Sequence, residues 1–107
     1  MTRFLNGPAQ GQRLMLRRAP IFLRVVEVGG KWDALDQVED TPAAGESIHV
    51  YRLAAKPCNC HIYKRGGGGG FFTMADYQFV SPQPADLEVR DLAAWRAWCQ
   101  RQPLPQL

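Results

Sequence analysis

A chain of 107 residues is long enough for one domain with a modest hydrophobic core and too short for two. Its hydrophobic share of 46% and charged share of 21% are typical of a globular protein in water, and no apolar run approaches the roughly 20 residues of a membrane-spanning helix. The net charge of +3 is modest, and the sequence contains no motif of a known nucleic-acid-binding module. Nucleic acid is therefore not the expected partner.

The first third of the chain reads as turns and short strands. Residues 6–11 combine Asn, Gly and Pro, which favour turns, and residues 13–17 alternate as a short strand. Residues 21–28 are β-branched and aromatic, which is typical of a strand buried on both sides for part of its length. The Gly-Gly pair at 29–30 predicts a hairpin turn into a strand at 31–35.

The middle of the chain predicts a loop followed by three strands. Residues 36–45 lack periodicity and indicate an acidic, exposed loop. Residues 46–53 and 59–65 alternate as strands that we expect to pair as a hairpin. Four residues with aromatic rings would then share a surface: His49, Tyr51, His61 and Tyr63. A further strand is expected over residues 71–80, with an interruption near residues 74–76.

One helix is predicted, between residues 86 and 102. Asp91 is a suitable N-cap because its carboxylate can accept hydrogen bonds from the first-turn amides. The apolar stripe of the helix consists of Leu92, Trp95 and Cys99, with Trp98 beside it. A helix of this length is marginal in water, so the two tryptophans must pack on the sheet.

These elements predict a single domain over residues 1–107, of the α+β class and mostly β. We expect five or six short antiparallel strands, curled into a small sheet or open barrel, with the C-terminal helix across one face. Unpaired edges of such a sheet would allow a homo-oligomer to form.

Five consecutive glycines, residues 66–70, are the most unusual feature of the sequence. Neither the P-loop nor the dinucleotide motif fits them, because basic residues precede them and a strand follows. Successive glycine amides can still form an anion-binding concavity, and cations beside aromatic rings suit a nucleotide. The alternative is a mobile hairpin loop without a ligand.

The predicted ligand-binding residues belong to the strands and the glycine loop of this region. They are Tyr51, Arg52, Tyr63, Lys64, Arg65, Gly67, Gly68 and Phe71. In this hypothesis the basic residues Arg52, Lys64 and Arg65 bind the phosphate. One of the aromatic side chains, from Tyr63, Tyr51 or Phe71, stacks on the base.

The positive charge lies in two blocks. Residues 1–26 carry five arginines and no acid, and residues 48–72 carry four basic residues and no acid. Between them, residues 27–47 carry six acids against one lysine. If the strands that carry the two basic blocks are neighbours, they form one cationic face; the alternative is that the arginines only solvate the outside of a sheet.

The three cysteines, at 58, 60 and 99, predict reduced thiols, because an odd number with C-x-C spacing is a poor disulfide framework. The spacing of Cys58, Cys60 and His61 is also too tight for a usual zinc site. Cys60 and His61 are adjacent on a strand and leave opposite faces, so they cannot act as nucleophile and base. We therefore expect no metal, no cofactor and no catalytic residue.

Residues 5–16 read Leu-Asn-Gly-Pro-x-x-Gly-x-x-Leu-x-Leu, and Arg-x-Pro follows. This opening resembles that of short uncharacterised proteins encoded by bacterial phages and prophages, and the Val-Tyr-Arg strand at 50–52 is in keeping with them. The resemblance covers about the first quarter of the chain. It implies a small β-rich accessory protein that acts by binding in the cytoplasm of a host bacterial cell, as proteins that blunt host defences do.

We therefore expect a non-enzymatic binding protein for a phosphate-bearing, nucleotide-like ligand, which the resemblance would make a sequestered host defence signal. The alternative is a protein-binding inhibitor of a host defence complex, or an assembly factor, acting through the acidic loop and exposed aromatic residues. An enzyme of small-molecule chemistry is a third reading. The first residues lack the apolar stretch of a signal peptide, which agrees with a cytoplasmic protein that has no membrane partner.

Overall fold

The computed structural model describes residues 1–16, 18–35, 46–63, 66–67 and 69–107, and it describes residues 59–63 and 69–72 as backbone alone. The strands are β1 (Thr2–Phe4), β2 (Arg13–Leu14), β3 (Phe22–Val28), β4 (Lys31–Ala34), β5 (Ile48–Leu53), β6 (Cys58–Tyr63) and β7 (Gly69–Phe79). The helices are α1 (Asp86–Arg90) and α2 (Leu92–Arg101). The predicted acidic loop at residues 36–45 lies outside the described residues.

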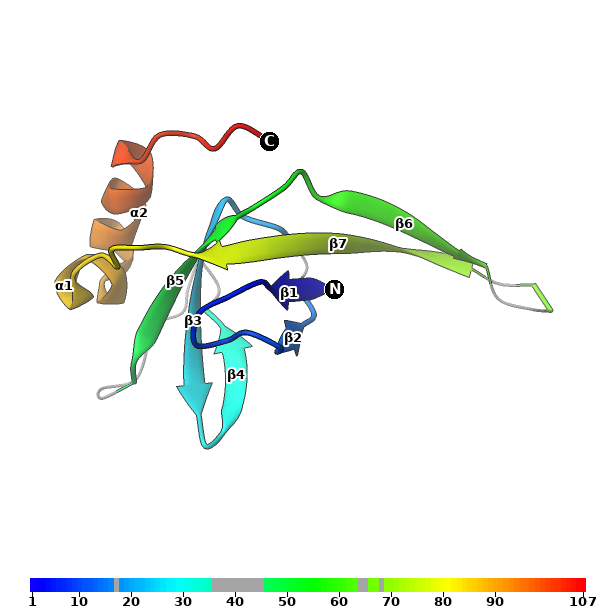
Figure 1. Ribbon diagram of the computed structural model, residues 1–107, viewed down its shortest axis with the longest axis horizontal. Helices are drawn as coiled ribbons and strands as arrows, with labels where there is room; N and C mark the ends of the chain where they lie inside the picture. The colour runs from blue at the N-terminus through cyan, green and yellow to red at the C-terminus, as the bar shows by residue number, and fades with distance from the viewer. Residues whose placement is uncertain (17, 36–45, 64–65, 68) are drawn as a thin grey trace.

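The strands form one mixed sheet in the order β2-β1-β7-β5-β3-β4. Its two end strands, β2 and β4, approach each other, so these six strands make a nearly closed barrel (Figure 1). The two helices pack end to end against one side of the barrel (Figure 1). The prediction of a mostly β domain with a C-terminal helix is confirmed.

One strand of the barrel was not predicted. β1 is parallel to β7, with Thr2 opposite Ala75 and Phe4 opposite Tyr77, whereas the other paired strands are antiparallel. Three residues are too few for an alternating pattern to be recognised. The pairing with β1 also runs through the place where an interruption of the last strand was predicted, and β7 is continuous there.

The predicted hairpin between the two central strands is wrong, because both pair with β7. β5 pairs with residues 77–79 of β7, and β6 pairs with residues 69–74. Residues 54–57 connect β5 to β6, and the Ala54 amide donates to the Asp76 carbonyl at 2.8 Å. His49 and Tyr51 are therefore in the barrel, whereas His61 and Tyr63 are in a part of the sheet outside it.

We call β6 together with residues 69–74 of β7 the β6/β7 arm. In Figure 1 it projects from the barrel along the longest axis of the molecule. The molecule measures 51 × 34 × 25 Å, and its radius of gyration is 15.0 Å. A compact chain of this length has a radius of gyration of about 13 Å, so the arm makes the molecule elongated.

Two hydrophobic clusters follow from the period of two in β3 and β5. Leu23, Val25 and Tyr51 point into the barrel, where they pack with Phe4 and Tyr77. Residues of the opposite parity lie on the outer face, where the helices cover them. This second cluster consists of Phe22, Val50, Val89, Trp95 and Trp98. The prediction that β3 is buried on both sides is confirmed.

The helix cap and helix packing are as predicted. The Asp91 side chain accepts a hydrogen bond from the Ala94 amide at 2.9 Å, at the start of α2. Trp95 is 1% exposed and Trp98 7% exposed. Arg24 of β3 lies under α2 with its guanidinium 5.3 Å from the Trp95 ring centroid, and it donates to the Val89 carbonyl at 2.8 Å. Arg24 thus holds the helices on the sheet.

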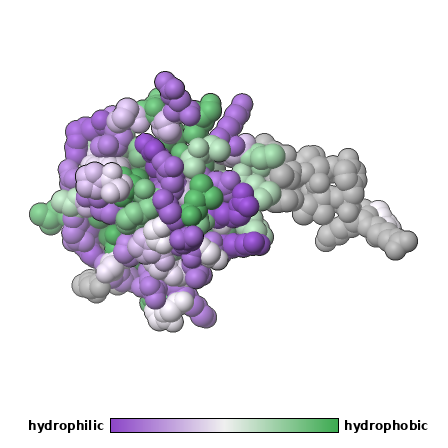
Figure 2. Space-filling model, viewed as in Figure 1, coloured by the Kyte–Doolittle hydropathy of each residue, from purple (hydrophilic) through white to green (hydrophobic). Residues whose placement is uncertain are grey.

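None of the described helices is both long enough and apolar enough to cross a membrane. On the face of the barrel in Figure 2, hydrophilic residues predominate among the coloured atoms, and the hydrophobic ones form small separate patches.

Candidate functional site

Tyr51 is a core residue and not an exposed stacking residue. Its side chain is fully buried, and its ring packs edge-on against Phe4 at a centroid distance of 4.7 Å. Its hydroxyl donates to the Asn6 carbonyl at 2.9 Å and accepts from the Ala9 amide at 2.8 Å. Burial raises the pKa of this hydroxyl, so the group stays neutral. The face of β5 that carries Tyr51 is the inner face of the barrel.

The turn that contacts Tyr51 is the segment on which the resemblance to phage proteins rested. Gly7 has a φ of +77°, and the Asn6 side chain accepts a hydrogen bond from the Phe79 amide at 2.7 Å. Ala9 of the same turn is fully buried in the inner cluster, so the turn packs as part of the barrel. Its Gly-Pro pattern has a structural explanation that is independent of any ligand.

Arg52 lies on the outer face of β5, next to Val50 of the helix-covered cluster. It is opposite Phe22 on β3 and opposite Gln78 on β7, which puts the three side chains in one row across the sheet. α2 contacts this row at Phe22, whose ring centroid lies 5.1 Å from that of Trp98. Arg52, the middle residue of the row, is half-buried.

The remaining predicted residues belong to the end of the arm. Tyr63 pairs with Gly69, and His61 pairs with Phe71. Gly67 is exposed, with a φ of +85°. Lys64, Arg65 and Gly68 lie outside the described residues. The strand before the glycines and the strand after them are therefore paired with each other.

The structure does not bring the predicted set together at one place. Arg52 is opposite Gln78, and Tyr63 is opposite Gly69, so the two are nine positions apart along β7. At about 3.3 Å per residue this is roughly 30 Å, which is too far for one mononucleotide. The set divides into a core residue, a residue of the barrel surface and a group at the end of the arm.

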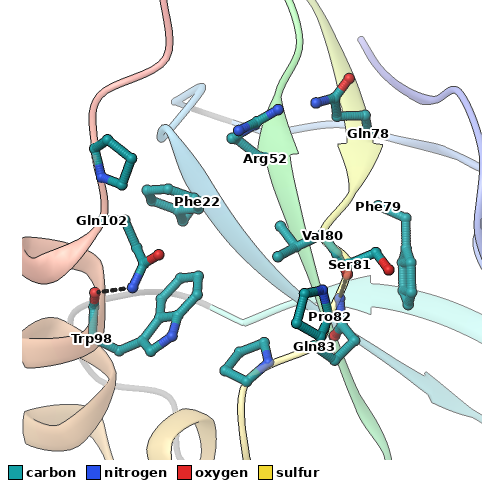
Figure 3. A pocket seen from close by; sticks show the side chains of 12 residues that line it. Phe22, Arg52, Gln78, Phe79, Val80, Ser81, Pro82, Gln83, Trp98 and Gln102 are labelled. Carbon is teal, nitrogen blue, oxygen red and sulfur yellow. Dashed lines mark hydrogen bonds between the residues drawn. The ribbon is translucent and has the colours of Figure 1, made fainter.

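A pocket of about 530 Å³ lies beside Arg52, between the end of α2, the outer face of β5 and β7, and the turn at 81–84 (Figure 3). Its apolar wall is formed by Phe22, Val80, Pro82, Pro84, Trp98 and Pro103. Its polar residues are Arg52, Gln78, Ser81, Gln83 and Gln102. Phe79 also borders the pocket, although its ring turns away from it toward the inner cluster.

Two of the polar side chains have structural partners. The Gln83 amide group accepts from the Val50 amide at 2.8 Å and donates to the Val50 carbonyl at 2.9 Å, so it continues the sheet where β7 ends. The Gln102 side chain donates to the Trp98 carbonyl at 3.1 Å, as the dashed line in Figure 3 shows. These bonds fix the turn and the end of α2 as walls of the pocket.

Arg52 differs from most other arginines of the described chain in having no partner. Arg3 pairs with Asp76 at 2.8 Å, Arg90 pairs with Asp86 at 3.0 Å, and Arg101 pairs with Glu88 at 2.7 Å. The Arg52 side chain makes no hydrogen bond and no ion pair with the described part of the chain. Its guanidinium is a half-buried positive charge at the mouth of a pocket.

Two arginines of the first basic block do not contribute to a cationic face. Arg24 is 1% exposed beneath α2, and Arg3 is neutralised by Asp76. Burial is compatible with the charge of Arg24 because its guanidinium has a carbonyl and an indole ring as neighbours.

No group of three potential metal ligands occurs among the residues that the structure describes. Cys99 is a half-buried residue of α2, and burial raises the pKa of its thiol to about 11, which keeps it in the unreactive protonated form. His49 lies 5.5 Å from the Trp32 ring, and desolvation lowers its pKa. Neither residue has the neighbours of a nucleophile and base.

Comparisons with protein-family models, with curated proteins and with solved structures found no match.

Sequence reasoning found Arg52 but missed the residues around it. Phe22, Gln78 and Trp98 come from three elements, and only the sheet register and the position of the helix bring them together. Trp98 was assigned to helix packing, which is also correct. The alternation within β5 did point to this position. Ile48, Val50 and Arg52 share one face of the strand, and Arg52 is the polar residue at the end of that apolar row.

Proposed function

We propose that this protein is a non-enzymatic binding protein and that its ligand is a small phosphate-bearing, nucleotide-like molecule held in the pocket beside Arg52. The observation that carries the proposal is the unpartnered guanidinium of Arg52 in a pocket with an aromatic wall. A half-buried charge without a partner loses hydration, and a bound anion would compensate for this loss.

The dimensions and chemistry of the pocket fit this class of ligand. Small-molecule sites have volumes of about 300–1,000 Å³ and combine apolar walls with a few polar groups. Phe22 and Trp98 pack edge-on at a centroid distance of 5.1 Å, so they form a rigid wall for a planar ring. Gln78 lies beside Arg52 and offers an amide for hydrogen bonding to the same ligand.

The setting that we propose follows from the resemblance of the N-terminal turn to phage proteins. In a phage-encoded protein of this kind, the ligand would be a host defence signal, and binding would sequester it in the bacterial cytoplasm. A binding protein needs no catalytic residue for this task. The described residues around the pocket accordingly need only hold a phosphate and a ring.

The test uses protein purified from bacterial cells without exposure to high salt. We expect excess absorbance at 260 nm that is released by denaturation and contains a phosphate-bearing compound by mass spectrometry. We expect Arg52→Gln to lose this compound. Arg96→Gln is the matched control, because Arg96 is exposed on α2 and outside the pocket.

A second pair of variants separates the pocket from the end of the arm. Replacing Lys64 and Arg65 together by alanine removes the cations of the sequence-based hypothesis. If the pocket is the site, this double variant retains the compound that Arg52→Gln loses. Loss of the compound in the double variant and retention in Arg52→Gln would move the site to the arm and contradict the proposal.

A further inference from the structure

The β6/β7 arm leaves the barrel as a ribbon of two strands. β6 pairs with residues 69–74 of β7, and no other described strand pairs with either of these segments. An isolated two-stranded ribbon is at best marginally stable in water, because it has too few strands to bury an apolar face. Addition of a third strand would therefore stabilise the arm.

β6 lacks the features that usually prevent strand addition. Natural edge strands carry lysine, proline or a bulge that blocks pairing with another chain. The sequence of β6 is Cys-Asn-Cys-His-Ile-Tyr, without a charged residue or a proline. The backbone groups of residues 59–63 that point away from β7 form an edge to which an extended segment can pair.

Basic residues flank β6 in the sequence. Lys56 is exposed two positions before β6, and Lys64 and Arg65 follow directly after it in the sequence. Residues 48–75 contain no acid. A strand beside β6 therefore gains from acidic residues at its two ends and is disfavoured by basic ones.

The same charges disfavour a second copy of β6 as the partner. Antiparallel pairing of residues 58–63 with themselves would place Lys56 of one copy opposite Arg65 of the other. Parallel pairing would place Lys56 beside Lys56. Like charges in such positions repel each other. Nucleic acid fits poorly as well, because a bound strand needs cations along the groove and β6 has none within it.

We propose that β6 is the docking edge for an extended segment of a partner protein, in which acidic residues flank a short apolar stretch. The segment adds to β7 and β6 as a third strand and is read mainly through its backbone. This interaction is separate from the ligand pocket, so it stands or falls independently of the role of Arg52.

The probes are two fluorescein-labelled peptides with the same alternating valine and threonine centre, one flanked by glutamate pairs and one by lysine pairs. Fluorescence anisotropy gives the affinity of each. We expect the acidic peptide to bind at least about tenfold more tightly, and the difference to shrink in 1 M salt, where the Debye length is about 3 Å. Amide hydrogen exchange of residues 59–63 should slow on binding.

Two adjacent proline variants locate the interaction on the free edge. Successive residues of a strand direct their N–H groups to opposite sides. Of the variants His61→Pro and Ile62→Pro, one therefore removes an N–H that faces β7, and the other, the outward variant, removes an N–H that faces away from β7. The outward variant should keep the exchange protection of the β6–β7 ladder and lose at least about tenfold in peptide affinity. Arg52→Gln should bind the acidic peptide as the unmodified protein does.

Several outcomes would overturn the proposal. They are equal affinity for the two peptides, no saturable binding up to about 1 mM peptide, and full affinity in both proline variants. Tighter binding of an oligothymidylate than of the acidic peptide would identify a nucleic-acid edge instead. A dimer in light scattering that both proline variants abolish would identify a second copy as the occupant.

Discussion

At the scale of single residues, Gly7 joins the N-terminal turn to the barrel in a way that only glycine allows. Its φ of +77° is a conformation that side chains disfavour, and a Cβ atom on it would lie 2.7 Å from the Phe79 side chain. The neighbouring residues of the turn contact Tyr51 and Phe79 through hydrogen bonds. Position 7 is thus where backbone strain and packing would both oppose a larger residue.

Gly11 provides a matched comparison, because its φ is +85° and nothing lies within 4 Å of a Cβ atom built on it. We expect Gly11→Ala to lower the free energy of unfolding by about 1–2 kcal/mol, the cost of a left-handed conformation. Gly7→Ala should cost about 1–3 kcal/mol more, because Phe79 must also move. Denaturant unfolding measures both. Equal losses would contradict the proposed contact.

His49 makes stability depend on pH. Desolvation holds its pKa below the ordinary value of about 6.5, so the unfolded chain binds a proton more readily than the folded protein does. This contribution to stability is complete above pH 6.5 and is lost as the pH falls toward the folded pKa. We expect His49→Gln to remove that part of the pH dependence in unfolding measurements between pH 7 and 5. An unchanged dependence would show that His49 does not cause it.

At the scale of elements, α2 is stable because of its packing rather than its length. It has only ten residues, and its buried residues are the two tryptophans, whose rings stack at a centroid distance of 5.3 Å. Trp95 also covers Arg24, which connects β3 to the end of α1. The end of α2 forms one wall of the pocket, so helix packing and the candidate site are linked.

We expect Trp95→Ala to lower the free energy of unfolding by about 3–5 kcal/mol, as for other large buried side chains. Arg96→Ala is the control, because its side chain is exposed on the same helix and should change stability by less than about 0.5 kcal/mol. Thermal and denaturant unfolding test the pair. Similar midpoints for the two variants would mean that α2 is not packed on the sheet as described.

At the scale of the whole molecule, local patterns in the sequence predicted local structure well. The Gly29-Gly30 hairpin, the Asp91 cap and the two-sided burial of β3 are each determined by a few consecutive residues. Pairing between distant strands was predicted less well. β6 was paired with β5 because the two are adjacent in sequence, whereas β7 is long enough to pair with both.

The candidate site shows the same difference between local and distant information. Arg52 was recognised as a basic residue on a strand, but its neighbours Gln78 and Trp98 come from β7 and α2. Tyr51 was taken as exposed, although alternation gave the two faces of β5 without indicating which one lies inside the barrel. Only tertiary packing decides that choice.

The role of Arg52 as the anion-binding residue is tested most directly by nuclear magnetic resonance. Arginine Nε–H and tryptophan indole N–H signals can be followed in one sample during titration with ADP, and adenosine serves as the ligand without phosphate. We expect ADP to shift the signals of Arg52 and Trp98 saturably and to leave Arg96 unchanged, and we expect adenosine to leave Arg52 unchanged. No shift of Arg52, or equal shifts of Arg52 and Arg96, would contradict the proposed site.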